Sequence, residues 1–413
     1  MLFLYNILVH IAGFFLKIVA LFQPKIKLFV NGRKAVFKTL AQNISTNDKV
    51  IWFHTASLGE FEQGLPVIEE VKKEYPSHKI LVTFFSPSGY EVKKNSTQAD
   101  VITYLPLDTK SNVQKFLNVV HPDLAIFVKY EFWPNYLNAL KKRKISTLLI
   151  SAIFRKEQIF FKPQGSFMRS SLKTFEHFFV QDESSKQLLN NIGFNNVTVS
   201  GDTRFDRVAE IVERNNTLSF IEDFKNDKLC FVAGSTWPED EALLIDYINK
   251  HAQDNVKYII APHNIKPHKI QELKNNLKVK TMLFSEKESK PLSTYKVFIV
   301  DTIGILTKIY SYANIAYVGG GMGTTGLHNT LEPAVFGIPV LIGKNYKGFK
   351  EAEDLVTQKG IVSISNLEEF DQNLTKFITN PVVRAQVGLL NHQYLKNNTG
   401  AKIQITYHIR KLV

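Results

Sequence analysis

The chain has 413 residues, 44% of them hydrophobic and 22% charged, which describes a globular protein long enough for two domains and excludes a disordered chain. Its single cysteine, Cys230, excludes an internal disulfide and a cysteine-rich metal site, and its place in LCFVAG predicts a buried strand residue. The net charge of +13 favours an anionic partner or surface, but no zinc spacing and no RNA-binding signature accompanies it, so we expect no nucleic-acid partner.

The first predicted element is an almost wholly apolar stretch, 2–22, interrupted mainly by Asn6, His10 and Lys17. It is long enough to cross a hydrocarbon core and lacks the basic start and small-residue cleavage site of a secretory signal. The lysines and arginine that follow it predict a membrane anchor over 1–23, with the main body on the cytoplasmic side. A helix that spans the membrane, one that lies in its interface and a buried core helix all stay open.

Short apolar runs then alternate with helix-length segments, which predicts parallel sheets covered by helices. In the first half the expected strands are 50–56, 79–85, 101–107, 124–129, 145–150, 177–180 and 197–200. In the second half they are 229–233, 257–261, 297–300, 315–318, 340–342 and 361–364.

This pattern predicts an α/β chain with two Rossmann-like domains and a cleft between them. We place the first domain at 24–209, a polar connection at 210–227 and the second domain at 228–413, whose last helix can pack back on the first. Such domains bind ligands at the carboxyl ends of their strands.

Candidate catalytic residues follow the strands of the first half. In HTASLGE, Ser57 is placed to cap a helix, Gly59 keeps its first turn uncrowded, and Glu60 is either a general base or a carboxylate that complements the helix dipole. Glu131, in YEFWPN, lies just past another apolar strand. Arg204, in GDTRFD, is placed to pair with an anionic sugar or phosphate, or with Asp206.

A serine-rich loop, TFFSPSGYE, separates these motifs. Ser86 and Ser88 stand at a strand-to-helix turn that either presents amides to an anion or caps the helix in the ordinary way.

The second half carries candidate nucleotide-binding residues. Residues 315–344 read IAYVGGGMGTTGLHNTLEPAVFGIPVLIGK, in which Gly320 and Gly321 follow a strand, and His328 with Asn329 opens a helix-like segment. Glu332 is placed to accept hydrogen bonds from ribose hydroxyls. In GSTWPEDE the amides of the first three residues are a second candidate, and the acids suit a helix start; those three are Gly234, Ser235 and Thr236.

HTASLGE, TFFSPSGYE, YEFWPN and GDTRFD, in this order and at these separations, resemble the 3-deoxy-D-manno-oct-2-ulosonic acid (Kdo) transferase family. The resemblance continues through GSTWPEDE, APHN, DTIG and LHNTLEP and covers nearly the whole chain. It implies the GT-B fold and an inverting transfer of Kdo from CMP-Kdo to a tetra-acylated lipid A precursor at the cytoplasmic face of the inner membrane. It also implies an anionic membrane surface as a partner.

By this resemblance Glu60 matches the catalytic base, and Glu131 and Arg204 match residues that stabilise the transition state. The matches to CMP contacts are Pro262, His263, Ile303, Gly304, Ile305, Asn329, Thr330, Leu331 and Glu332. The chain departs from the family pattern where Lys is usual at Arg204, Asn at Asp202, Arg at His263, Glu at Ile305 and Pro at Thr330. The loop at 321–326 is longer than usual.

No bound metal and no cofactor is expected, because such folds usually work without one and no Asp-x-Asp motif is present. Two other functions remain open. One is a membrane-associated GT-B transferase that uses a UDP-sugar, and the other is a catalytically inactive lipid- or sugar-binding protein that has kept the fold.

Overall fold

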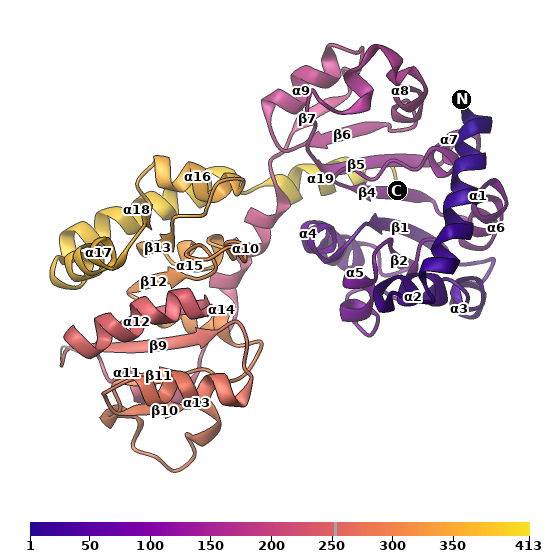
Figure 1. Cartoon of the computed structure of the whole chain (residues 1–413). Coiled ribbons are helices and arrows are strands. Elements are labelled where there is room, and N and C mark those ends of the chain that lie inside the picture. Colours follow the sequence, from indigo (N-terminus) through magenta and orange to yellow (C-terminus); the bar gives the residue numbers. More distant parts are fainter. Residues whose placement is uncertain (252–253) are drawn as a thin grey trace. The chain divides into compact units, whose positions relative to one another are not determined.

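A computed structural model describes residues 1–251 and 254–413 of the chain. By its internal contacts the chain divides into two compact units (Figure 1). Unit 1 comprises Met1–Arg207 and Thr399–Val413, and unit 2 comprises Val208–Asn398.

Unit 1 is built on a seven-stranded parallel sheet of order β3-β2-β1-β4-β5-β6-β7. Its strands are β1 (Lys49–Thr55), β2 (His78–Phe84), β3 (Val101–Tyr104), β4 (Leu124–Val128), β5 (Ser146–Ala152), β6 (His177–Val180) and β7 (Val197–Val199). The helices of this part of the chain are α1 (Leu2–Val19), α2 (Pro24–Gly32), α3 (Val36–Asn43), α4 (Leu58–Glu74), α5 (Pro87–Lys93), α6 (Lys110–Val120), α7 (Pro134–Lys142), α8 (Ser166–Leu172), α9 (Glu183–Asn190) and α10 (Thr203–Glu213), which continues into unit 2.

Both faces of this sheet are buried, as near-continuous apolar strands require. Along β1 the alternating side chains divide between two cores, with Val50 and Trp52 in one and Ile51 and Phe53 in the other. The strands are therefore held rigidly, and the loops at their carboxyl ends carry the polar candidates.

Unit 2 has the same construction, with a seven-stranded parallel sheet of order β10-β11-β9-β8-β12-β13-β14. Its strands are β8 (Leu229–Thr236), β9 (Val256–Pro262), β10 (Thr281–Leu283), β11 (Val297–Ile299), β12 (Ile315–Val318), β13 (Val340–Gly343) and β14 (Ile361–Ile364). Its helices are α11 (Ser219–Lys225), α12 (Pro238–His251), α13 (Pro267–Asn276), α14 (Leu306–Ile309), α15 (Leu331–Ala334), α16 (Lys350–Thr357), α17 (Leu367–Thr379) and α18 (Pro381–Asn398).

The predicted α/β class with two Rossmann-like units is confirmed, and every expected strand is present. β10 was not expected, because three residues at a sheet edge give too short an apolar run to stand out. Cys230 is a buried strand residue, as predicted, and burial raises the pKa of its thiol to about 12.

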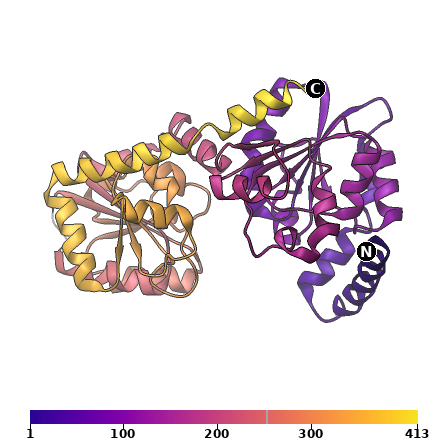
Figure 2. The same cartoon turned by 90° about the horizontal axis from the view of Figure 1, so that it is seen from above.

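Unit 2 begins earlier than the second predicted domain, whereas the last helix packs back on the first unit, as the sequence analysis allowed. The stretch 210–227, expected as a connection, belongs to unit 2, and α11 buries Ile221 and Phe224 there. The last helix, α19 (Ala401–Ile409), belongs to unit 1, where it packs against α4 (Figure 2). Asp206 fastens the start of α19 by accepting the backbone N–H groups of Gly400 at 2.8 Å and Lys402 at 3.2 Å.

The N-terminal helix α1 is, among the described residues, the one helix long and apolar enough to cross a membrane by length and composition. None of its residues is fully buried. It lies along the outside of unit 1 and contacts α2 (Figure 1).

Candidate active-site residues in each unit

Glu60 lies in the first turn of α4, directly after the carboxyl end of β1. Its carboxylate is buried, with only 6% of the residue exposed. Ser57 was expected to cap α4 but makes no side-chain capping bond; its hydroxyl donates to Glu60 Oε2 instead. Lys129 Nζ lies 3.6 Å from Glu60 Oε1. Gly59 is exposed, and a Cβ placed there would meet nothing closer than 3.8 Å, so the first turn of α4 is open on that side.

Glu131 lies in the loop between β4 and α7 and is 9% exposed. Its Oε2 is 3.0 Å from the indole Nε1 of Trp133 and 3.3 Å from Nε2 of His54, a fully buried residue of β1. The same indole N–H lies 3.0 Å from His54 Nε2, and an indole only donates, so it serves one or both of these acceptors. Sequence analysis did not single out His54 or Trp133 as site residues.

The hydroxyl of Thr83 contacts the other ring nitrogen of His54. Its Nδ1 lies 2.9 Å from Thr83 Oγ1 of β2, and that oxygen accepts the indole N–H of Trp52 at 2.8 Å. The pairs β2–β1 and β1–β4 are direct neighbours in the sheet. Strand order alone therefore aligns Thr83, His54 and Glu131 across three chain segments.

Arg204 is paired with Asp202. Its Nε donates to Asp202 Oδ2 at 2.9 Å, and its backbone N–H donates to Oδ1 at 2.9 Å. Asp202 is 5% exposed and also accepts the side-chain amide of Gln63, one turn after Glu60 on α4. Arg204 Nη2 also lies 2.8 Å from Asp202 Oδ2, and the side chain is 41% exposed, so Asp202 holds a guanidinium that still reaches solvent.

The two serines of the β2–α5 loop form an ordinary helix cap. Ser86 Oγ accepts the backbone N–H of Ser88 at 3.3 Å and lies 3.0 Å from the Ser88 hydroxyl. This is the capping alternative of the sequence analysis.

In unit 2, Asp240 organises the loops after β8 and β12. This residue is fully buried, and its carboxylate accepts the N–H of Trp237 at 2.9 Å, the N–H of Gly320 at 2.8 Å and the hydroxyl of Tyr317 at 2.6 Å. The sequence suggested only an acid favoured by a helix dipole. Asp240 instead ties together the turns that carry Gly234–Thr236 and Gly320.

The glycines after β12 serve close backbone packing. Gly320 has φ +91°, and a Cβ there would lie 2.2 Å from the carbonyl oxygen of Gly326. A Cβ on Gly321 would lie 3.0 Å from the backbone nitrogen of Gly343, and the Gly321 carbonyl accepts the N–H of Asn345 at 2.8 Å. The neighbouring backbone therefore leaves no room for a side chain at these two positions.

Three rings form a layer at the carboxyl ends of β8, β9 and β12. The exposed ring of His263 stacks on Trp237 at 4.5 Å and lies 4.6 Å from the ring of His328. Trp237 Nε1 donates to His328 Nε2 at 3.2 Å, which places the ring proton of neutral His328 on Nδ1. Burial, and next the neighbouring His263, lower the pKa of His328, which favours that neutral form. Trp237 is a further residue that sequence analysis did not select.

The loop after β11 is open. Ile303 is 81% exposed, and Gly304, at φ +93°, has no atom within 4 Å of where a Cβ would stand. Ile305, the last residue of this loop, and Pro262, at the end of β9, are half-buried. Leu306, the first residue of α14, reaches Gly234, where a Cβ would meet Leu306 Cδ2 at 3.0 Å.

The segment opened by His328 and Asn329 is shorter than expected. α15 spans only Leu331–Ala334, a single turn, so a helix dipole contributes little there. The side chain of Asn329 accepts the N–H of Leu331 at 3.1 Å and donates to Glu332 Oε1 at 3.2 Å. The Thr330 hydroxyl is buried and has no hydrogen-bond partner in the part of the chain that the structure describes.

Comparison with known proteins bears on both units. Residues 31–207 match the family model of 3-deoxy-D-manno-octulosonic-acid transferase (kdotransferase). The chain is 28% identical over 387 residues to a bifunctional glycosyltransferase/methyltransferase of Fusobacterium nucleatum, covering 89% of this chain but only 58% of that longer relative. It is 29% identical over 335 residues to a 3-deoxy-D-manno-octulosonic acid transferase of Aquifex aeolicus, covering 80% of this chain and 86% of the relative.

Among solved structures, UDP-GlcNAc 2-epimerase from Neisseria meningitidis is similar with a TM-score of 0.63 and 15% identity, covering 88% of this chain and all of that one. At this identity the likeness concerns the fold alone.

Proposed function

The chain belongs to the family of 3-deoxy-D-manno-octulosonic acid (Kdo) transferases, which are glycosyltransferases, and we propose that it transfers Kdo from CMP-Kdo to a tetra-acylated lipid A precursor. The observation that carries the proposal is the environment of Glu60. A buried carboxylate at the carboxyl end of β1, beside Lys129 and open at Gly59, suits a general base.

In this reaction an acceptor hydroxyl oxygen attacks the anomeric carbon of Kdo and transfers its proton to Glu60. The bond from that carbon to the phosphate oxygen breaks, and CMP leaves with the electron pair. Attack opposite to the leaving group inverts the anomeric centre. Glu60 Oε2 accepts from Ser57 and Lys129 approaches Oε1 only to 3.6 Å, so the carboxylate keeps capacity for an incoming hydroxyl.

Glu131 and Arg204 are proposed to stabilise charge as the bond to CMP breaks. Trp133 and His54 hold the Glu131 carboxylate in one position, and Asp202 holds the guanidinium of Arg204 through Nε and Nη2. Preorganised groups of this kind stabilise a transition state because they need not reorient during the reaction. The exposed part of Arg204 suits an anionic carboxylate or phosphate.

Unit 2 is proposed to bind the CMP part of the donor. Gly304 offers an uncovered backbone, His263 an exposed ring beside Trp237, and the Thr330 hydroxyl a buried polar atom without a partner among residues 1–251 and 254–413. Glu332 is proposed to accept from the ribose hydroxyls. No metal or cofactor is proposed, which activity in the presence of a chelator would test.

The site of action is proposed to be the cytoplasmic face of the inner membrane. The apolar exposed helix α1 and the exposed lysines at 25, 27, 34 and 38 support attachment to anionic lipid. Attachment would hold the enzyme beside an acceptor that cannot leave the bilayer.

The test is incubation of the full chain with CMP-Kdo and tetra-acylated lipid A precursor, followed by mass spectrometry of the lipid. A mass gain of one or more Kdo units is expected. Glu60→Gln is expected to abolish the gain, because the amide cannot accept the proton, and Glu69→Gln, an exposed position later on α4, should leave it unchanged. No gain with folded wild-type protein would reject this donor–acceptor pair, and a screen of UDP-sugars would follow.

A further inference from the structure

The helix α1 contacts the rest of unit 1 through one narrow stripe that runs along its length. The stripe is formed by residues spaced three or four apart, which are buried or half-buried: Tyr5, Asn6, Val9, Gly13, Leu16 and Ala20. Residues at this spacing share one side of a helix. Unit 1 therefore covers one side of α1 from its first turns to its last.

Polar contacts fasten the first turns. The Tyr5 hydroxyl donates to Asp108 Oδ2 at 2.7 Å, and Asn6 Oδ1 accepts the side-chain amide of Asn135 at 2.8 Å. Asp108 is 2% exposed and also accepts the backbone N–H groups of Asn135 and Tyr136, each at 3.0 Å. A hydroxyl of α1 thus completes a buried carboxylate site of unit 1.

Close packing fastens the later turns. A Cβ on Gly13 would lie 3.2 Å from Leu107 Cδ1. Next to it a groove of about 400 Å³ runs between α1, α2 and α3, with Leu16 and Phe29 in its wall and Lys17 and Lys34 among its lining residues. Both ends of α1 are therefore held against the same folded unit.

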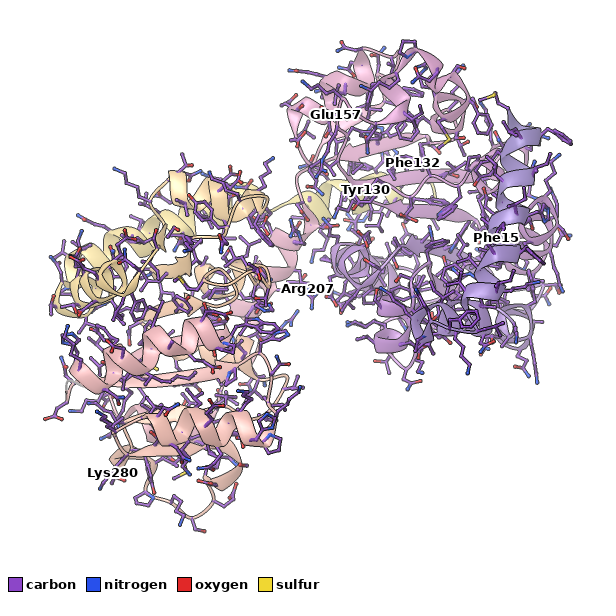
Figure 3. The ribbon with its side chains drawn as sticks, in the orientation of Figure 1. Phe15, Tyr130, Phe132, Glu157, Arg207 and Lys280 are labelled. Carbon is purple, nitrogen blue, oxygen red and sulfur yellow. The ribbon has the colours of Figure 1, made fainter. Side chains whose placement is uncertain are left out.

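The rest of the helix surface is apolar and uncovered. Because successive residues are rotated by about 100°, the exposed apolar side chains occupy an arc of about 160°. They include Phe3 at 77% and Phe14 at 62% exposed. Phe15, which Figure 3 labels on α1, is 58% exposed. His10 and Lys17, one heptad apart, line the boundary between this arc and the stripe that unit 1 covers.

We infer that α1 lies in the plane of an anionic lipid leaflet, with its apolar arc among the acyl chains and His10 and Lys17 at the headgroups, and that it does not cross the bilayer. This inference rests on the membrane attachment proposed above and not on the transferase activity. An apolar face with basic residues at its edge is the pattern of an interfacial helix.

A spanning α1 would conflict with its contacts. Tyr5 and Leu16 are separated by about 16 Å along the helix axis, so if both kept their contacts, part of unit 1 would lie inside a hydrocarbon layer about 30 Å thick. Asp108 and Asn135 would then stand at membrane depth, where charged and polar groups are costly. If α1 instead left the rest of unit 1, Asp108 would lose a buried hydrogen bond, and the Tyr5 hydroxyl and Asn6 Oδ1 would enter hydrocarbon without the partners they have here.

Charge identifies lipid as the occupant of the exposed face. Lys17, Lys25, Lys27, Lys34 and Lys38 are all exposed on or just after α1. An anionic leaflet complements them, whereas a second copy of the chain would bring two sets of lysines together.

The experiment measures the depth of α1 in vesicles of phosphatidylcholine and phosphatidylglycerol. Nitroxide labels are placed on the full chain by Leu4→Cys, Ile11→Cys or Ile18→Cys, three exposed positions one heptad apart near the middle of the apolar arc. Cys230 is fully buried and stays unlabelled, which unlabelled wild type checks, and Lys141→Cys on α7 gives the aqueous reference. Depth is read by paramagnetic resonance from the relative access of oxygen and a nickel chelate.

We expect the protein to float with the vesicles and the three labels to lie at one shallow depth. A label at Ile11 that lies about 10 Å deeper than those at Leu4 and Ile18, seven residues away on either side, would overturn the inference in favour of a spanning helix. Aqueous labels on protein that does not float would overturn it together with the membrane attachment. Labels shielded from both reagents in dimers that do not float would assign the face to a second copy. Kdo transfer is assayed separately on the same protein, so its failure is distinguishable from each of these results.

Discussion

Replacing Asp240 by alanine is expected to destabilise unit 2 by about 3–5 kcal/mol. The carboxylate is fully buried and accepts three hydrogen bonds, two from backbone N–H groups and one from the Tyr317 hydroxyl. Each buried donor left without an acceptor costs about 1–3 kcal/mol, and some relaxation keeps the total below the simple sum. Domain stabilities are about 5–15 kcal/mol, so this loss is a large part of the total.

Two matched variants separate the contributions of these hydrogen bonds to the loss of stability. Asp240→Asn keeps one oxygen for the two backbone donors, and the Tyr317 hydroxyl can turn to accept from the new amide, so we expect a loss of about 1–2 kcal/mol. Tyr317→Phe removes one donor and leaves both backbone bonds of Asp240, so about 1 kcal/mol is expected.

Hydrogen exchange with mass spectrometry suits this test, because a chain of two units need not unfold in one step. The opening free energies of amides in β8 and β12 should fall in the order wild type, Asn, Ala, while those in β1 and β4 of unit 1 stay unchanged. The apparent KM for CMP-Kdo should rise in the same order, because Asp240 positions Trp237 and Gly320. An alanine variant within 1 kcal/mol of wild type in unit 2, or equal effects of Asn and Ala, would refute the reasoning.

Three further outcomes follow from the two sites. Trp133→Phe keeps an aromatic ring beside Phe85, where the ring centroids are 4.6 Å apart, but removes the N–H that lies 3.0 Å from Glu131 Oε2. The kcat should therefore fall about 10–100-fold. An unchanged kcat would show that Trp133 has no part in the reaction. His263→Arg should lower the KM for CMP-Kdo, because a guanidinium can stack on Trp237 and bind phosphate in a bidentate way. His263→Ala should raise that KM. Equal KM values for the two variants would contradict the assignment of His263 to the donor site. Burial, and next His408, lower the pKa of His177 to about 4 from 6.5, so the unfolded chain binds more protons between these values and unit 1 should lose stability as the pH falls through that window. His177→Gln should flatten that part of the stability–pH curve, and an unchanged slope would count against the assignment.

The strands were predictable because parallel strands buried on both faces leave continuous apolar runs in the sequence. The candidate residues were found because they follow those runs, and the ends of parallel strands meet at one edge of a sheet. What they contact was not predictable in the same way. Ser57 matched the rule for a helix cap, yet its hydroxyl donates to Glu60, since both choices need only a short polar side chain at that position.

Acids near helix starts show the same limit. Asp240 stands among three acids in the first turn of α12, and a helix dipole favours all of them equally. Only the approach of β12 and its glycine turn, some 80 residues later in the chain, makes Asp240 a buried acceptor of three hydrogen bonds.

The sequence by itself determined the two α/β units, the order of the polar motifs at their strand ends and the apolar character of α1, because these depend on local composition and periodicity. Only the tertiary structure decided which side chains meet, such as His54 with Glu131, Asp202 with Gln63, and Tyr5 with Asp108. The physical reason is that a hydrogen bond depends on distance and direction in space. Strand order and helix packing set both for residues that the sequence separates widely.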